Sequence, residues 1–241
     1  QSSSSAINPE VGTEVQSTYN APNSNVPDGA AAVNGAGKIV VANNTHIEMY
    51  DEDGTQLYSQ SEGTFWSPLN PTANIYDPRI EYDTFNNRFI IVELHGNQPT
   101  LTQIYIAVSK TSNPESGWWF YEFNANPGDP NLWFDYPKIG YSEETLTVSG
   151  NMFTATGNSS TESKVILFTL YDAYAGLTMS SEYFDDVEAG AFGWNEYSIK
   201  PCSYPFGIYG PGLYMIGRDD ADDIAWWDIS ANAGDSPTMD G

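Results

Sequence analysis

Short runs of alternating apolar and polar residues, about five to eight residues long, recur along the chain from Asp28 onward. Val, Ile, Tyr, Phe and Trp fill these runs, and Gly, Pro, Asn or Asp bound them. Both features are typical of β-strands. No stretch has the 3.6-residue period of a convincing amphipathic helix, although Asp172 to Ala189 has room for one short helical turn. The pattern therefore predicts an all-β chain.

The expected strands form successive groups. The first group is a three-stranded antiparallel meander with strands at Lys38 to Ala42, His46 to Tyr50 and Thr55 to Tyr58. The second group has strands near Ile80 to Tyr82, Arg88 to Leu94, Gln103 to Ser109 and Trp118 to Phe123. The third contains Thr145 to Asn151 and Lys164 to Tyr171. The fourth contains Tyr197 to Ile199, Phe206 to Tyr209, Leu213 to Arg218 and Ile224 to Ile229.

Two similar phrases indicate that these groups are repeats. Tyr76-Asp77-Pro78-Arg79-Ile80-Glu81-Tyr82-Asp83 and Phe134-Asp135-Tyr136-Pro137-Lys138-Ile139-Gly140-Tyr141 each contain an Asp, a Pro, a cation, an Ile and a Tyr. Openings at Asp28, Asp77, Asp135 and near Pro201 lie roughly 50 to 65 residues apart, close to one four-stranded propeller blade with a long loop. We predict a β-propeller, or part of one, with about four recognisable four-stranded blades. These lie near residues 28–74, 75–130, 131–190 and 191–232, after an extended arm or linker at 1–27.

Composition narrows the range of partners. Thirty-two acidic and eight basic residues give a formal net charge of -24, which repels nucleic acid and anionic lipid. No apolar run is long enough to span a membrane. Cys202 is the single cysteine, so an intrachain disulfide is excluded, and its side chain is expected to be buried. The start at Gln1, without a leader, favours export, and we expect a secreted or cell-surface protein.

The residue pattern resembles a known family. Pro27-Asp28-Gly29, Asp77-Pro78-Arg79-Ile80, Ala107 to Pro114 and Asp135 to Gly140 together look like the large secreted bacterial β-propeller exoproteins, often of Bacteroidetes and carried by type IX secretion. The resemblance is good from Val26 to Phe153 and loose beyond. It implies export and surface attachment. It also implies more blades than four, so the chain is expected to be a portion of a larger propeller.

The first candidate site consists of Asp77, Arg79 and Asp135. One interpretation is structural, because an Asp at a strand start accepts backbone N–H bonds and Pro needs no ladder partner. The other is functional: repeated residues share one face, so these side chains could hold a cation or ligand at a common mouth. Asp83 and Arg88 flank a turn and are expected to pair across it.

Calcium is the second candidate. Asp51-Glu52-Asp53-Gly54 and the run Asp219, Asp220, Asp222 and Asp223 are rich in carboxylates, which Ca²⁺ prefers as ligands. Neither has EF-hand spacing, and plain acidic turns are the alternative. The second run is the better calcium candidate, because four carboxylates in five residues repel one another unless they are neutralised.

The aromatic pairs provide the third candidate. Trp118-Trp119 and Trp226-Trp227 alternate faces along a strand, so one member of each pair packs inward and its neighbour faces outward. Trp119 and Trp227 are therefore candidates for stacking on sugar rings. Packing in the core is the alternative for either residue.

These observations favour an extracellular, non-enzymatic binding or structural module with a protein or glycan partner. One alternative is a propeller glycoside hydrolase of the sialidase type, which needs an arginine cluster, whereas the chain has three arginines and lacks the Ser-x-Asp-x-Gly motif. Three Arg side chains beside a Tyr–Glu pair in the central mouth would favour the hydrolase. A solvent-facing Trp platform with no convergent acid pair would favour the binding module. A second alternative is a subunit of a surface assembly that forms through residues 1–27.

Overall fold

The computed structural model describes most of the chain after the first 27 residues. The described residues are 28–97, 100–129, 131–154, 160–185, 187–189, 194–195, 198–203, 213–218 and 224–240. The predicted arm at residues 1–27, the predicted strand Phe206 to Tyr209 and the acidic run Asp219, Asp220, Asp222 and Asp223 lie outside them. No helix in the described part is long and apolar enough to cross a membrane.

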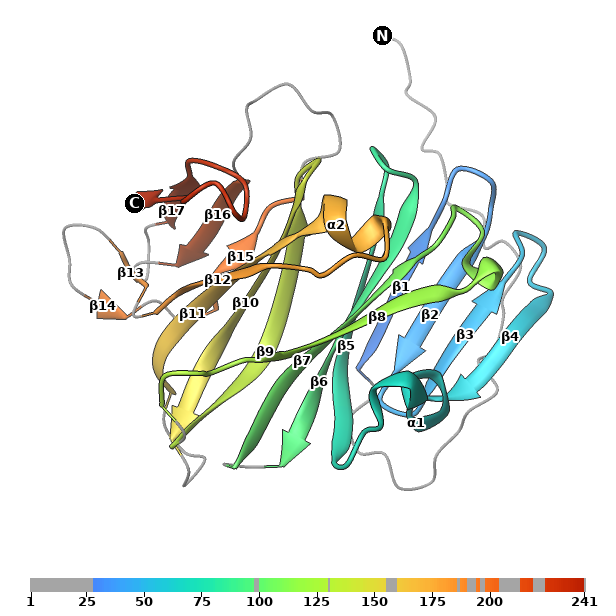
Figure 1. Ribbon diagram of the computed structural model, residues 1–241, viewed down its shortest axis with the longest axis horizontal. Coiled ribbons are helices and arrows are strands. Elements are labelled where there is room, and N and C mark those ends of the chain that lie inside the picture. The colour runs from blue at the N-terminus through green and yellow to red at the C-terminus, as the bar shows by residue number, and fades with distance from the viewer. Residues whose placement is uncertain are drawn as a thin grey trace, which may run out of the picture.

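Four four-stranded antiparallel sheets make up the fold, which confirms the predicted all-β propeller class (Figure 1). Sheet 1 contains β1 (Gly29–Val33), β2 (Ile39–Asn43), β3 (His46–Tyr50) and β4 (Gln56–Ser61). Sheet 2 contains β5 (Asn74–Asp83), β6 (Arg88–Asn97), β7 (Leu101–Ser109) and β8 (Trp118–Asn124). Sheet 3 contains β9 (Leu132–Tyr141), β10 (Thr145–Thr154), β11 (Ser160–Thr169) and β12 (Ser181–Phe184). Sheet 4 contains β15 (Lys200–Pro201), β16 (Leu213–Arg218), β17 (Ile224–Ile229) and β18 (Met239–Asp240).

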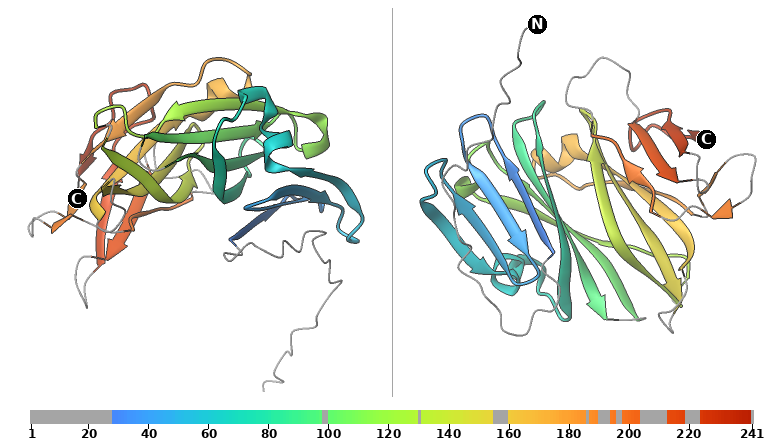
Figure 2. Two further views of the ribbon diagram at one scale, coloured as in Figure 1. Left: turned by 90° about the horizontal axis from the view of Figure 1, so that it is seen from below. Right: turned by 180° about the vertical axis from the view of Figure 1, so that it is seen from behind.

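Short elements connect the sheets. They are α1 (Glu62–Phe65), η1 (Ser67–Leu69), η2 (Pro114–Ser116), α2 (Leu170–Tyr174) and the hairpin of β13 (Glu188–Ala189) with β14 (Trp194–Asn195). Each four-stranded sheet is a meander in which strands follow one another in chain order. Figure 2 shows the four sheets following one another along an arc.

Two expectations about strands need correction. Sheet 1 has four strands rather than three, because Gly29-Ala-Ala-Ala-Val33 pairs with β2 despite its low β-propensity. Sheet 4 begins at Lys200, and the preceding Ser198 and Ile199 are not in a strand.

Two expectations about single side chains also need correction. Asp83 and Arg88 form no ion pair. Instead Asp83 caps the turn by accepting from Phe85 N, while Arg88 donates to the Asn86 carbonyl. Cys202 is a free cysteine that is partly rather than fully buried, because it follows directly after the short edge strand β15.

Apolar side chains fill the space between consecutive sheets. Along β6, Phe89 and Ile91 pack toward sheet 1, whereas Ile90, Val92 and Leu94 pack toward sheet 3. Successive side chains of a strand point to opposite faces. Because both faces of β6 are buried, its residues are apolar at successive positions rather than at every second one. A third cluster, including Met215 and Trp227, joins sheets 3 and 4.

The first strands of the sheets lie side by side. Strand β5 contacts both β1 and β9, and β9 also contacts β15. The first strand of each sheet therefore faces the centre of the arrangement, and its residues can meet those of the neighbouring sheets.

Strands β5 and β9 carry the same irregularity. The pairing of β5 with β6 skips Asp77 and Pro78, and the pairing of β9 with β10 skips Tyr136 and Pro137. Asp77 and Tyr136, the residue before each Pro, both have φ of 56°. A non-glycine residue in this left-handed region is strained, and such strain and bulges gather at functional sites.

Candidate active site

A cavity of about 690 Å³ opens beside these two bulges. Its lining comes from β5, the end of β6 and β9, together with Asp28 just before β1 and Asn44 in the turn between β2 and β3. The lining residues are Asp28, Asn44, Asn74, Tyr76, Asp77, Arg79, Gly96, Asn97, Trp133, Asp135 and Tyr136. Three Asp, three Asn and three aromatic side chains therefore surround one space, here called the acidic pocket.

The three aspartates of the acidic pocket interact in a row. Asp28 precedes β1, Asp77 lies on β5 and Asp135 lies on β9, so each comes from a different sheet. The Asp77 carboxyl is close enough to the carboxyls of Asp28 and Asp135 for both to influence its pKa, and it in turn influences that of Asp135. Asp77 and Asp135 therefore titrate as a coupled pair.

Burial sets the proton affinity of the trio. Desolvation raises the pKa of Asp135 to about 7, the Asp77 carboxyl raises it too, and a bond from the Tyr136 backbone and the charge of Arg79 lower it. Desolvation also raises the pKa of Asp77, which the charge of Arg79 opposes. Burial raises the pKa of Tyr76, the phenol between these carboxyls, so it stays neutral. Asp135 therefore exchanges its proton near neutral pH.

Arg79 is the one cation among the described residues that line the acidic pocket. Its Nε donates to the Pro137 carbonyl at 2.7 Å, and its Nη1 donates to the Pro78 carbonyl at 2.7 Å. The guanidinium is thus bound to the two prolines of the two bulges.

Polar and aromatic groups complete the lining. The Asn44 side chain accepts from the Asp77 backbone N–H at 2.9 Å, which fixes the strained residue. Trp133 is 8% exposed, and its indole Nε1 has no hydrogen-bond partner among the described residues. Tyr136 is 51% exposed at the rim. Amides bind hydroxyl groups, and aromatic faces stack on apolar sugar faces, so the lining suits a polyhydroxylated ligand.

The structure brings together three of the predicted site residues and separates the other two. Asp77, Arg79 and Asp135 meet in the acidic pocket. Trp119 is half-buried elsewhere, with Lys110 Nζ 3.9 Å from its ring centroid. Trp227 is 2% exposed in the core between sheets 3 and 4, whereas its neighbour Trp226 is 59% exposed. The ligand-binding roles of these five residues stay predictions.

Metal binding finds no support within the described ranges. No group of three or more His, Cys, Asp or Glu side chains is arranged there to hold a metal ion. The predicted calcium ligands Asp219, Asp220, Asp222 and Asp223 lie outside those ranges, so that hypothesis stays a prediction.

A second carboxyl pair lies between sheets 1 and 2, away from the pocket lining. Glu93 of β6 is 0% exposed and Glu62 of α1 is 6% exposed. Desolvation raises the pKa of both groups, and Glu93 also raises that of Glu62. The Trp66 indole N–H donates to Glu93.

Sequence reasoning does not identify Asp28, Asn44 or Trp133 as site residues. It places Asp28 only as a unit opening, equivalent in type to Asp77 and Asp135. The signal that could have found it is this same repetition, because three repeats with an aspartate next to or within their first strand place three carboxyls near one centre. Asn44 sits in a hairpin turn, and no local pattern distinguishes it.

No protein-family model matches the chain, and no curated protein matches it. Several solved structures are similar in shape. A neuraminidase-like protein of A/flat-faced bat/Peru is 8% identical with a TM-score of 0.49, covering 89% of this chain and 57% of its own. A Bacillus subtilis arabinanase is 14% identical with a TM-score of 0.44, covering 88% of this chain and 75% of its own. An α-L-arabinofuranosidase from Fusarium graminearum is 12% identical with a TM-score of 0.47, and the match covers 94% of this chain and 71% of that protein's chain.

These findings correct the main functional prediction. The binding module was expected to lack a convergent acid pair, whereas Asp77 and Asp135 meet in the acidic pocket. Two of the three similar structures are glycan-cleaving enzymes by name, which is a property of those proteins. The prediction of a non-enzymatic binding or structural module is therefore wrong, and the glycoside hydrolase alternative is favoured. Because the TM-scores are below 0.5, the chemistry assigned to the chain rests on the acidic pocket and not on these likenesses.

Proposed function

We propose that the protein is a glycoside hydrolase acting on a neutral glycan in the acidic pocket. The observation that carries this proposal is the row Asp28–Asp77–Asp135, drawn from three sheets into one cavity, with Asp135 holding a pKa of about 7. Glycoside hydrolysis needs one carboxyl that gives a proton and a second that acts as a carboxylate.

The geometry assigns Asp135 as the general acid. Its proton passes to the glycosidic oxygen as the bond from that oxygen to the anomeric carbon breaks, and the leaving sugar departs as an alcohol. Asp28, at the other end of the row, is the second carboxylate. It either takes a proton from the attacking water or forms the glycosyl ester that water then cleaves; the separation of the two carboxyls decides which.

Asp77 lies between the two and interacts with both. Its charge adds to the effect of burial in raising the pKa of Asp135 to about 7, so that part of the Asp135 population is protonated at neutral pH. After proton transfer both carboxylates are charged, and their repulsion favours the return of a proton to Asp135. Asp77 is therefore assigned as the residue that adjusts the acid.

The charge of the pocket selects the substrate class. Three carboxyls repel an anionic sugar, and the one lining cation is already bound to two backbone carbonyls. A sialic acid or uronic acid carboxylate therefore lacks a partner among the described lining residues, so the sialidase form of the hydrolase alternative is not supported. A neutral saccharide places its hydroxyls against Asn44, Asn74 and Asn97.

The test is a panel of neutral pentose and hexose oligosaccharides, with sialylated and uronate oligosaccharides alongside, and new reducing ends as the readout. We expect cleavage within the neutral set, and loss of cleavage in the double variant Asp28→Asn/Asp135→Asn. Glu143→Gln, an exposed carboxylate in the turn after β9, is the matched control and retains activity. Cleavage confined to the anionic set, or equal cleavage by the double variant, contradicts the proposal.

A secreted or cell-surface location is part of the same proposal, as is kinship with secreted Bacteroidetes-type exoproteins. Both rest on the charge of -24 and the quoted sequence phrases. Fractionation of the source cells checks the location: recovery of the protein in the cytoplasm alone contradicts it.

A further inference from the structure

The two bulges are not equivalent in the residues that they place in the acidic pocket. When the prolines are aligned, Asp77 on β5 corresponds to Tyr136 on β9, and Tyr76 corresponds to Asp135. The two carboxyls therefore come from positions offset by one residue. The Asp77–Asp135 contact depends on how the β5 bulge is set against the β9 bulge.

Arg79 is the side chain that joins these bulges. It lies one residue beyond the first bulge and reaches across to the second, donating to the Pro78 carbonyl on its own strand and the Pro137 carbonyl on β9. Proline lacks an N–H, and its carbonyl at a bulge is left outside the strand ladder, so each carbonyl needs a donor from elsewhere. A planar guanidinium supplies two fixed donors, which an ammonium does not.

We propose that Arg79 is the positioning residue of the acid pair: it fastens the two bulges together and so holds Asp77 against Asp135. This inference rests on the proposed function for its catalytic meaning, but its structural claim stands separately. Arg79 has a second effect, because its charge favours the ionised form of both carboxyls. The other charged or titratable groups at the pair are Asp28 and Tyr76.

Two substitutions separate these effects. Arg79→Gln removes both the charge and the two fixed N–H donors of the guanidinium. Arg79→Lys keeps the charge and removes those two fixed donors. Arg88→Gln is the matched control, because Arg88 also donates to two backbone carbonyls, those of Asn86 and Asn87, but stacks on Tyr174 outside the pocket lining.

The primary measurement is the carbon NMR titration of aspartate carboxyls in the full chain, with Asp135 assigned through Asp135→Asn. In Arg79→Lys, which keeps the charge, we expect the Asp135 midpoint to move downward, because the Asp77 carboxyl that raises it is no longer held against it. In Arg79→Gln the midpoint lies above that of Arg79→Lys, because an opposite charge is also lost, and Arg88→Gln leaves it in place. A midpoint unmoved in Arg79→Lys overturns the proposal, whether or not any glycan is cleaved, so this result is separate from failure of the proposed function.

Arg79→Lys tests the positioning itself and also serves if Arg79→Gln does not fold. Two coupled carboxyls titrate in two separated steps. We expect the two titration midpoints to lie closer together in Arg79→Lys, because Arg79 no longer joins the two bulges and the two carboxyls interact less. On a cleaved glycan, kcat falls by up to about 100-fold, and the pH profile shifts with the two titration steps. An unchanged separation of the steps in Arg79→Lys overturns the proposal.

Discussion

The acidic pocket and the Glu62–Glu93 pair both hold carboxyl groups with raised pKa values, yet their surroundings differ. The pocket carboxyls line an open cavity and have a cation, Arg79, beside them. Glu93 is fully buried, lies under Trp66 and takes a hydrogen bond from its indole. Burial alone therefore does not mark a functional site. Access for a ligand, with groups that can bind one, makes the distinction.

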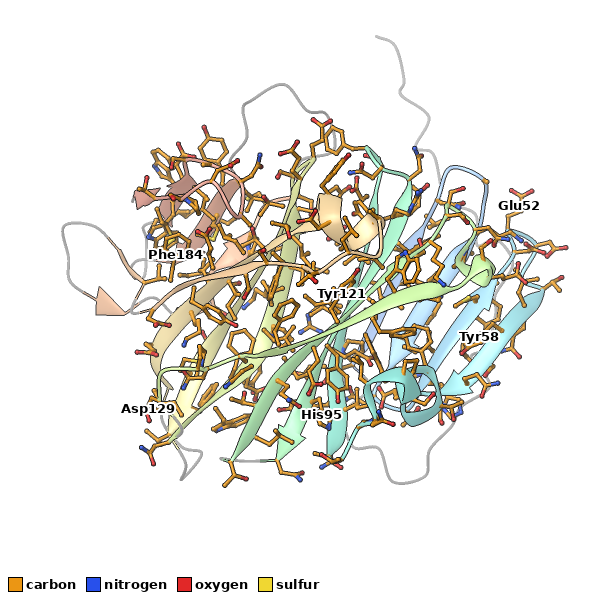
Figure 3. All side chains as sticks on the ribbon, in the orientation of Figure 1. Glu52, Tyr58, His95, Tyr121, Asp129 and Phe184 are labelled. Atoms are coloured by element: carbon orange, nitrogen blue, oxygen red, sulfur yellow. The ribbon has the colours of Figure 1, made fainter. Side chains whose placement is uncertain are left out.

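The interior near the Glu62–Glu93 pair is filled by side chains with structural partners. His95, labelled in Figure 3, lies two residues beyond Glu93 on β6, and its ring stacks on Tyr105 with centroids 4.5 Å apart. Its Nε2 accepts from the backbone N–H groups of Thr72 and Ala73, the residues that lead into β5. These side chains support the start of β5.

The largest expected effect separates the two regions by activity. Asp135→Asn should lower kcat on a cleaved glycan by about 10²- to 10⁴-fold, because the general acid is lost. Glu93→Gln should leave kcat near that of the wild type, because Glu93 does not line the cavity. Steady-state kinetics near pH 7 on both variants measure this. Equal losses of kcat in Asp135→Asn and Glu93→Gln would contradict the functional difference between the two regions.

The second effect is on stability. Here a variant at the Glu62–Glu93 pair should change the protein more than a variant in the acidic pocket does. Trp66→Phe removes the donor to Glu93 and leaves a buried carboxyl without it, which should lower the free energy of unfolding by about 1 to 3 kcal/mol. Urea unfolding measures the change. The pocket variant Asp135→Asn, which removes a half-buried ionisable group, should change stability less; a larger loss in Asp135→Asn contradicts the comparison.

The third effect is the pH dependence of stability. The folded-state pKa rises from 4.5 to about 8 for Glu93 and to about 10 for Glu62, because of burial. The folded state therefore keeps protons that the unfolded state loses. Stability is full below about pH 4.5 and falls as pH rises through 8 to 10.

Glu93→Gln should flatten that fall, and Asp135→Asn should flatten only its part below about pH 7. Thermal unfolding scans from pH 5 to pH 9 provide the measurement. A wild-type profile that rises with pH over this range would show that other groups dominate.

The smallest effect concerns strain in the pocket. Tyr136 has φ of 56°, which glycine adopts without cost, so Tyr136→Gly should raise stability by about 1 kcal/mol. Its ring, 5.9 Å from that of Phe153 between centroids, is also lost, which subtracts from the gain. The same exchange at Tyr183, a half-buried strand residue, serves as the control and should only destabilise. Loss of stability at both positions contradicts the strain explanation.

The repeated phrases predicted the propeller class because they carry local chemistry: a strand start, a Pro at a bulge and a following β run. Strand β1 was missed because an alanine-rich segment becomes a strand only through pairing with β2. Tertiary contact decided that element, and local propensity did not. Asp83 and Arg88 are cross-strand partners at the turn, but they form no ion pair. Asp83 instead accepts from Phe85 N and the Tyr174 hydroxyl, and Arg88 donates to the Asn86 carbonyl.

For the site, the sequence indicated Asp77, Arg79 and Asp135, which line one pocket. The two aspartates occupy equivalent places when the two phrases are aligned on their first Asp. The strand registers show that they are offset by one residue relative to the prolines. Asp28 and Asn44 could not be assigned from local sequence, because their place in the pocket depends on the docking of sheet 1 against β5.

The division of the carboxyl row among three sheets has a consequence for folding. Each sheet is a meander of consecutive strands and can form from local chain contacts. The row Asp28–Asp77–Asp135 exists only after sheets 1, 2 and 3 have docked. Bringing the three carboxyls together costs free energy, which the apolar clusters between the sheets offset. Catalytic activity would thus appear late in refolding, after the far-ultraviolet signal of the strands, and would report the docking of the sheets rather than their formation.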